Sequence, residues 1–174
     1  MGSNYKEKLA DINAFIFDVD GVLTDGSLVI SESGELLRTM NVKDGFAMKF
    51  AIDNGYKIGI ISGGTNESVR KRLNGLGIEE IHLKSHDKIV PFNNFLMKYN
   101  LNKENVLVMG DDIPDIPIIK LAGIGCCPQD AVPEVKAVSN YISQKNGGKG
   151  CVRDVIEQVT VSYTHLTLPT IYSV

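Results

Sequence analysis

Short runs of β-favouring residues alternate along this chain with segments of helical periodicity, and this alternation limits the folds open to it. The expected strands are Ala14–Val19, Lys57–Ile61, Glu80–Leu83, Val106–Met109, Gly123–Cys127 and a weaker one at Tyr141–Ser143. The expected helices lie near Asp44–Asn54, Asn66–Leu76, Lys88–Tyr99, Ile116–Leu121 and Gly150–Val159. Strands and helices in alternation predict an α/β fold, with a mostly parallel sheet and helices on both of its faces.

One segment interrupts the alternation directly after the first expected strand. Residues 27–42, SLVISESGELLRTMNV, have the pattern of two short strands around the turn Glu32-Ser33-Gly34, which predicts a β-hairpin. The segment is too short to form a domain, so we interpret it as a flap.

The length of 174 residues fits one domain, which we expect to span residues 1–159. Residues 160–174 form an atypical tail with four threonines and no acidic residue, lysine or arginine. This tail fits two interpretations, an added edge strand or a non-native extension left by cloning, and we exclude it from the functional argument.

The composition excludes several classes of function. A net charge of −3 predicts no general affinity for nucleic acid or for anionic membranes. No apolar run approaches the ~20 residues that span a bilayer, and the N-terminus lacks the apolar segment of a secretory signal. We therefore expect a cytoplasmic protein. The three cysteines have no metal-binding spacing and are expected to be buried thiols.

Polar and charged side chains follow four of the expected strands. They are Asp18 and Asp20 with Gly21 after the first strand, Ser62, Gly63 and Gly64 after the second, Lys88 at the start of the helix after the third, and Asp111, Asp112 and Asp115 after the fourth. Ligands of an open parallel sheet bind beyond the carboxyl ends of its strands, so we expect these groups to meet at one edge.

This set of residues suits the hydrolysis of a phosphate monoester. A carboxylate, Asp18, can attack phosphorus and form an aspartyl-phosphate. Mg²⁺ prefers oxygen ligands, which Asp18 and Asp111 supply. Lys88 adds positive charge and Ser62 a hydrogen bond to a phosphoryl oxygen. Asp20 is placed to protonate the leaving alcohol and then take a proton from water.

Each of these residues also has a purely structural interpretation. An Asp-x-Asp-Gly sequence is often a turn, Ser62 could open a helix, and Lys88 could be a surface lysine. We favour Asp115 as the group that orients Lys88. Asp112 stays divided between a helix cap and the outer shell of a metal site.

The sequence resembles a known superfamily at this point. DVDGVLTDG, IISGG, the DK of SHDKIVP and GDDIPD resemble the four motifs of the haloacid dehalogenase-like (HAD) phosphohydrolases. That resemblance implies a HAD-like Rossmannoid core, an aspartyl-phosphate and Mg²⁺. By position, Asp18 is implied as nucleophile and metal ligand, Asp20 as acid/base and metal ligand through its main-chain carbonyl, and Asp111 as the last protein ligand.

A narrower resemblance involves RTMNVKDGF, GGKGCVRD and the absence of a cap domain. These features resemble the 3-deoxy-D-manno-octulosonate 8-phosphate (KDO 8-phosphate) phosphatases, which implies a cytoplasmic homotetramer that serves lipopolysaccharide biosynthesis. The resemblance implies substrate contacts, in addition to those of Asp20 and Lys88, at Asn41, Val42, Lys43, Asp44, Gly45, Lys49, Gly64 and Arg72. For Lys43, Lys49 and Arg72, a solvated helix face is the alternative.

Three alternatives stay open. Family members that act on the octulosonate usually carry arginine at the position of Gly64, and a sister branch that acts on nine-carbon sugar acid 9-phosphates (KDN or N-acylneuraminate) carries glutamate there. The chain could therefore serve a nine-carbon substrate. A receiver-like phosphoacceptor module is the non-enzymatic alternative, and a scaffold of the same fold without catalysis is the third.

Overall fold

The computed structural model describes the backbone of residues 4–167 and the side chains of residues 4–161. Its main sheet has six strands in the spatial order β5-β4-β1-β6-β7-β8, all parallel. The strands are β1 (Ala14–Phe17), β4 (Lys57–Ile61), β5 (Glu80–His82), β6 (Val106–Met109), β7 (Ile124–Cys127) and β8 (Tyr141–Ile142). The predicted α/β fold is confirmed, and every expected strand is present with its limits shifted by two residues at most.

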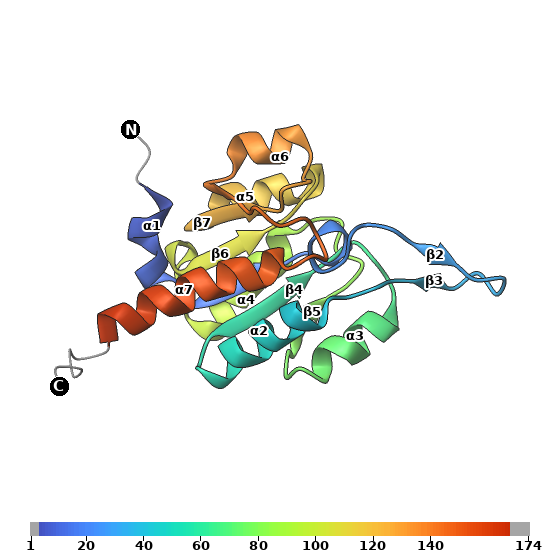
Figure 1. Ribbon diagram of the computed structural model, residues 1–174, viewed down its shortest axis with the longest axis horizontal. Helices are drawn as coiled ribbons and strands as arrows, with labels where there is room; N and C mark the ends of the chain where they lie inside the picture. The colour runs from blue at the N-terminus through green and yellow to red at the C-terminus, as the bar shows by residue number, and fades with distance from the viewer. Residues whose placement is uncertain (1–3, 168–174) are drawn as a thin grey trace.

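Helices cover both faces of this sheet (Figure 1). One core cluster joins Phe15 and Phe17 of β1 to α2 (Val42–Asp53), α3 (Glu67–Asn74) and α7 (Cys151–Thr167). The other joins Ala14 and Ile16 to α4 (Ile89–Tyr99), α5 (Ile116–Leu121) and α6 (Pro133–Val138). Alternate residues of β1 thus enter opposite cores, because side chains of a strand alternate between its two faces. The remaining helix, α1 (Tyr5–Lys8), precedes the sheet.

The chain reverses its direction of travel across the sheet at β1. From β1 it proceeds to β4 and β5 on one side, and it then returns to β6 on the other side of β1. The carboxyl ends of β1 and β6 therefore flank a topological switch point, which is where ligands of open α/β sheets bind.

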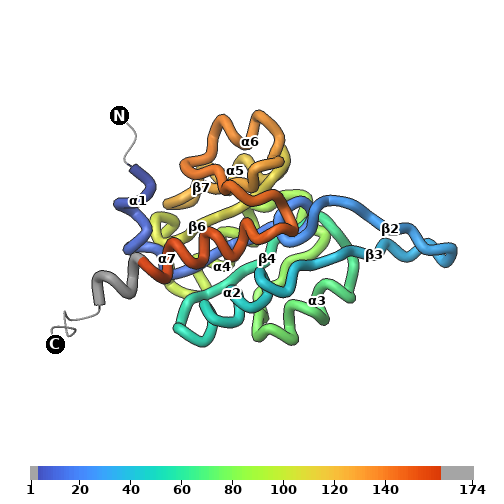
Figure 2. The backbone as a smooth tube through the Cα atoms, viewed as in Figure 1, coloured from blue at the N-terminus to red at the C-terminus, as the bar shows by residue number. Residues whose placement is uncertain are grey.

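The interruption after β1 is a two-stranded antiparallel hairpin, β2 (Val29–Ile30) and β3 (Leu36–Leu37), as the sequence predicts. It projects away from the main sheet as an extended arm (Figure 2). The strands are short and exposed on both faces in this single chain. The next helix, α2, begins where the Asn41 side chain accepts a hydrogen bond from the Lys43 amide, a standard N-cap.

The C-terminal helix α7 is longer than expected. The sequence predicts an end near Val159, but the helix continues to Thr167. Thr160 does not stop it, since its hydroxyl donates to the Ile156 carbonyl one turn earlier. Residues 160–167 are therefore helical and form no edge strand. The expectation for residues 168–174 lies outside the described residues, and the origin of the tail stays a prediction.

Helices α1 and α6 were not expected from the sequence. The first is a single turn, and the second starts at Pro133, after an irregular segment that shows little periodicity. The cysteines Cys126, Cys127 and Cys151 are free and buried, as expected. Among residues 4–167, no helix combines the length and apolar character that a membrane crossing needs.

Candidate active site

The carboxyl ends of the central strands open into one cavity of about 400 Å³. Its lining includes Asp18, Asp20, Ser62, Gly63, Gly64, Lys88, Asp111, Asp112 and Asp115, together with His86. All the acids, the hydroxyl and the lysine that follow the four strands thus share a single cavity. They converge because parallel strands end at the same edge of the sheet.

The turn after β1 aims Asp18 at the cavity. The Oδ1 atom of Asp18 accepts from the Val19 amide at 2.7 Å, and the backbone then turns through Gly21, whose φ is +87°. Thr24, which sequence reasoning missed, closes this turn: its fully buried hydroxyl accepts from the amides of Gly21 and Gly26. Gly21 is required here, because its φ lies in the left-handed region that other residues rarely adopt.

Lys88 is buried at 5% exposure, and its ammonium group lies close to three oxygen atoms. Its Nζ lies 2.5 Å from Oδ1 of Asp115, 3.2 Å from the carbonyl oxygen of Ile61 and 3.2 Å from Oδ1 of Asp18. Burial lowers the pKa of this amine, but the two carboxylates outweigh burial and leave its pKa above the ordinary value. Lys88 is thus a fixed positive charge in the floor of the cavity.

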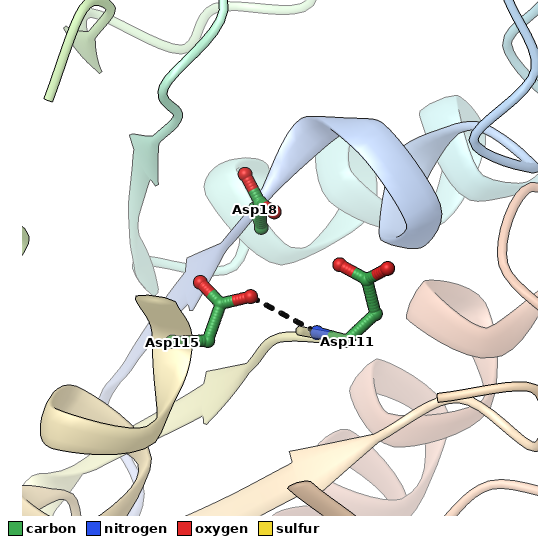
Figure 3. Close-up of side chains that lie close together, drawn as sticks. All are labelled: Asp18, Asp111 and Asp115. Atoms are coloured by element: carbon green, nitrogen blue, oxygen red, sulfur yellow. Dashed lines mark hydrogen bonds between the residues drawn. The ribbon is translucent and has the colours of Figure 1, made fainter. Parts of the chain in front are cut away.

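Asp115 organises the acidic loop as well as the lysine. Its Oδ2 accepts from the amides of Asp111 at 3.0 Å and Asp112 at 3.3 Å, the first of which is drawn in Figure 3. Gly110 makes room for it, since a Cβ there would lie 2.3 Å from the Cβ of Asp115. Asp112 itself accepts from the Ile113 amide at 2.7 Å, which is the geometry of a helix cap.

Three carboxylates crowd together across the switch point. Oxygen atoms of Asp18, Asp111 and Asp115 all lie within 4.8 Å of one another (Figure 3). Burial, and then the charge of Asp115, raise the pKa of Asp18 to about 7, although Lys88 opposes the rise. Burial, and then the neighbouring carboxylates, raise the pKa of Asp111 to about 8.

These raised pKa values indicate that the single positive charge of Lys88 does not neutralise the three neighbouring carboxylates. A divalent cation would relieve the repulsion, and carboxylate oxygens are the ligands that hard cations prefer. The residues present therefore fit a metal ion.

Two further groups line the cavity. Ser62 is buried, and its hydroxyl accepts from the Gly64 amide at 3.1 Å. Asp20 is 37% exposed and pairs with Arg38, which arrives from the base of the hairpin. Sequence reasoning did not single out Arg38, although it lies in the RTMNVKDGF segment. His86, for which the sequence predicts no role, also lines the cavity.

The other expected substrate contacts lie outside this cavity in the single chain. Lys49 is half-exposed and pairs with Asp53 along α2. Asp44 is 1% exposed and accepts from the Arg153 amide at the start of α7. Val42 and Lys43 are exposed on the first turn of α2, and Asn41 caps that helix.

Arg72 and Gly45 contact each other outside the cavity that holds Asp18. A Cβ on Gly45 would lie 2.7 Å from Nη2 of Arg72, so the glycine makes room for the guanidinium. Arg72 lines a second cavity, of about 280 Å³, between the hairpin and α3. As substrate contacts, these residues and those of the first turns of α2 stay predictions.

Comparison with known proteins agrees with this geometry. The family model of haloacid dehalogenase-like hydrolases matches residues 74–156. The 3-deoxy-D-manno-octulosonate 8-phosphate phosphatase KdsC of Escherichia coli (strain K12) is 33% identical over 150 residues, which cover 86% of this chain and 80% of the relative. This chain belongs to the KDO 8-phosphate phosphatase family.

Solved structures of KDO 8-phosphate phosphatases have the same fold as this chain. The enzyme from Yersinia pestis superposes with a TM-score of 0.91 at 30% identity, covering 95% of this chain and 90% of that one. The enzyme from Moraxella catarrhalis, solved in complex with a magnesium ion, a phosphate ion and KDO, has a TM-score of 0.89 at 29% identity, covering 95% of this chain and 97% of that one.

Proposed function

We propose that this chain catalyses the Mg²⁺-dependent hydrolysis of KDO 8-phosphate to KDO and phosphate, a step of lipopolysaccharide biosynthesis. The observation that carries the proposal is the convergence of Asp18, Asp20, Ser62, Lys88 and Asp111 on one cavity of about 400 Å³. The similarity to curated KDO 8-phosphate phosphatases over most of the chain supports the choice of substrate.

The carboxylates of Asp18 and Asp111, with the main-chain carbonyl of Asp20, would hold the Mg²⁺. The crowding of acids at the switch point supports this assignment. When bound, the ion would neutralise the charge that otherwise keeps a carboxylate and a phosphate apart. We place Asp115 outside the direct ligands, because one of its carboxylate oxygens contacts Lys88 and the other accepts from two backbone amides. We place Asp112 there because its carboxylate caps the helical turn that follows.

In the first half-reaction, a carboxylate oxygen of Asp18 forms a bond to phosphorus while the bond from phosphorus to the sugar oxygen breaks. Asp20 gives its proton to that leaving oxygen. The Ser62 hydroxyl and the Lys88 ammonium are placed to bind phosphoryl oxygens, because both face the cavity beside Asp18. Asp115 keeps Lys88 in this position through their 2.5 Å contact.

In the second half-reaction, Asp20 takes a proton from water, whose oxygen attacks the phosphorus of the aspartyl-phosphate. The bond between phosphorus and Asp18 then breaks, which releases phosphate and restores the carboxylate. Each Asp20 proton lost in the first half is regained in the second, so the cycle balances.

A comparison of kcat/KM for KDO 8-phosphate and for N-acylneuraminate 9-phosphate tests the substrate. We expect the eight-carbon ester to be preferred, as the relatives' activity suggests, even though Gly64 lacks the arginine usual in that branch. A preference for the nine-carbon ester would reverse the choice. Stoichiometric phosphorylation without turnover would instead support a receiver-like module, and a folded protein with neither activity would support a scaffold.

We further propose a cytoplasmic homotetramer. Its support is the family resemblance and the exposed apolar surface of the hairpin, where Val29 is 63% and Ile30 71% exposed in the single chain. Assembly would bury these side chains and bring substrate contacts such as Lys49 and Arg72 to a neighbouring site. Sedimentation velocity tests this proposal: the wild type should sediment as a tetramer and Val29→Lys/Ile30→Lys as smaller species, whereas a monomeric wild type would contradict it.

A further inference from the structure

The most specific contact of the Asp20 carboxylate is its ion pair with Arg38. Nε of Arg38 donates to Oδ1 of Asp20 at 2.7 Å, and Nη2 donates to Oδ2 at 3.1 Å. This two-bond arrangement fixes the plane of the carboxylate as well as its position, which a single hydrogen bond does not do.

The structure holds the guanidinium itself in place. Its third nitrogen, Nη1, donates to the Leu36 carbonyl in β3 at 3.1 Å, and Asn66 of the α3 N-terminus donates to the same carbonyl at 2.8 Å. The Arg38 side chain is only 7% exposed. It is therefore anchored between the base of the hairpin and the main domain.

Gly64 leaves the space that this pair needs. A Cβ at position 64 would lie 3.4 Å from Nη2 of Arg38 and 3.4 Å from Oδ2 of Asp20. A methyl group would fit there, but a long side chain would compete with the guanidinium for the same volume. Arg38, at the base of the hairpin, thus places a positive charge beside Asp20, whereas the loop after β4 carries no charged side chain at Gly64.

The pair suits one of the two forms that Asp20 takes in the proposed cycle better than the other. A carboxylate accepts two charge-assisted hydrogen bonds from a guanidinium, whereas the hydroxyl oxygen of a protonated carboxyl group is a weak acceptor. The two-bond geometry therefore favours the carboxylate, which is the form that takes a proton from water in the second half-reaction. Each oxygen keeps a second lone pair for that water.

We propose that Arg38 is a positioning residue that orients the Asp20 carboxylate for hydrolysis of the aspartyl-phosphate on Asp18. The inference rests on the proposed function. In this step the water O–H bond breaks and its proton moves to Asp20, while the water oxygen bonds to phosphorus and the bond from phosphorus to the Asp18 oxygen breaks. Removal of Arg38 should slow this half-reaction far more than the formation of the aspartyl-phosphate.

Rapid-quench kinetics with the sugar acid phosphate that the wild type hydrolyses fastest tests the proposal. We expect Arg38→Met to release about one equivalent of sugar per active site in a burst, ahead of phosphate, followed by slow turnover. The steady-state kcat should fall by about tenfold to a hundredfold, within the range that acid–base catalysis contributes. Acid-quenched protein should carry the accumulated phosphoryl group.

Two further variants separate positioning from a general loss of structure. Arg38→Lys keeps the charge but not the two-bond geometry, so it should restore part of kcat and shrink the burst. Arg70→Met removes an arginine that contacts Glu67 and the Ile81 carbonyl and does not line the cavity, so its kinetics should match the wild type. A partly unfolded Arg38 variant would instead show a lower rate with sugar and phosphate still released in step, and therefore no burst.

The outcomes distinguish this inference from the function on which it depends. An Arg38→Met protein that releases sugar and phosphate together, or that changes only KM, would overturn the positioning role while the wild-type phosphatase activity stands. A wild type that hydrolyses no phosphate ester would overturn the proposed function itself.

Discussion

A Cβ atom on Gly21 would lie 1.9 Å from Oδ2 of Asp111, although the two residues are far apart in the sequence. The backbone of the turn after β1 thus touches the carboxylate that follows β6. The position of this acid is set by a contact that only glycine permits.

Substitution of this glycine should therefore damage the site more than the fold. In Gly21→Ala, the methyl group would displace the Asp111 carboxylate, and we expect Mg²⁺ affinity and kcat/KM to fall by at least about tenfold, as for other disturbed metal sites. Gly55→Ala is a matched control, because Gly55 has a similar φ of +89° with nothing within 4 Å of its Cβ position.

The two alanine variants should share the cost of a left-handed φ, roughly 1 kcal/mol of stability. Thermal unfolding with and without Mg²⁺, followed by steady-state kinetics, checks this prediction. Equal kinetic losses in both variants would show that the clash with Asp111 is unimportant.

Replacement of the proposed nucleophile should abolish turnover without unfolding the protein. Asp18→Asn keeps the shape of the side chain but removes its nucleophilic charge, so we expect kcat to fall by at least about a thousandfold. Asp25→Asn is the control, since Asp25 is an exposed loop acid outside the cavity lining. Phosphate release measures both variants, and an Asp18→Asn protein with a near-normal rate would contradict the mechanism.

Loss of the buried lysine should destabilise the protein in a pH-dependent manner. Lys88→Met leaves the neighbouring carboxylates without their cation, which costs about 3 kcal/mol when a buried pair is broken from one side. The pKa of Asp18 should rise further in this variant, because Lys88 normally lowers it. We therefore expect a large loss of stability at pH 8 and a smaller one at pH 5.5.

Removal of the partner as well should recover part of this loss. In Lys88→Met/Asp115→Asn, the unbalanced buried charge of Asp115 is gone, so urea denaturation should show the double variant to be more stable than Lys88→Met alone. Strictly additive effects of the two substitutions would mean that the 2.5 Å contact carries no coupling.

The raised pKa values of Asp18 and Asp111 predict how metal-free protein responds to pH. In the unfolded chain these carboxyl groups titrate near pH 4, whereas the folded values are about 7 and about 8. Between these limits the folded chain binds more protons than the unfolded chain. The free energy of unfolding should therefore fall as pH rises from about 4 to about 8, and then level off.

Mg²⁺ should reverse this trend, because it binds the carboxylate forms and displaces their protons. We expect Mg²⁺ to raise Tm more at pH 8 than at pH 6, and calorimetry in two buffers to detect proton release at pH 6. Asp18→Asn, in which one titrating group is absent, should show a shallower pH dependence. A dependence equal to that of the wild type would assign the effect to other groups.

The chemistry of the site could be predicted from the sequence because its parts are local. Asp18, Ser62 and Asp111 each follow a strand directly, and parallel strands deliver such residues to one edge whatever their order in the sheet. The helices other than α1 and α6 could be predicted for the same reason, since periodicity and caps such as Asn66 act within a few residues.

Contacts between distant segments could not be predicted in this way. The pair of Arg38 and Asp20 depends on where the hairpin folds back, and the burial of Asp44 depends on how α7 packs against α2. A residue pattern records which face of an element is apolar, but it does not record the neighbour that this face meets.

The sequence by itself determined the alternating strands and helices, the four strand ends that carry reactive groups, and hence the kind of reaction. Only the tertiary structure decided which cation meets Asp20, why Gly21 must lack a side chain, and which expected substrate contacts lie away from the cavity. The physical reason is range: strand and helix formation and turns are governed by neighbouring residues, whereas charge pairing and close packing depend on side chains that the folded chain brings together from far apart.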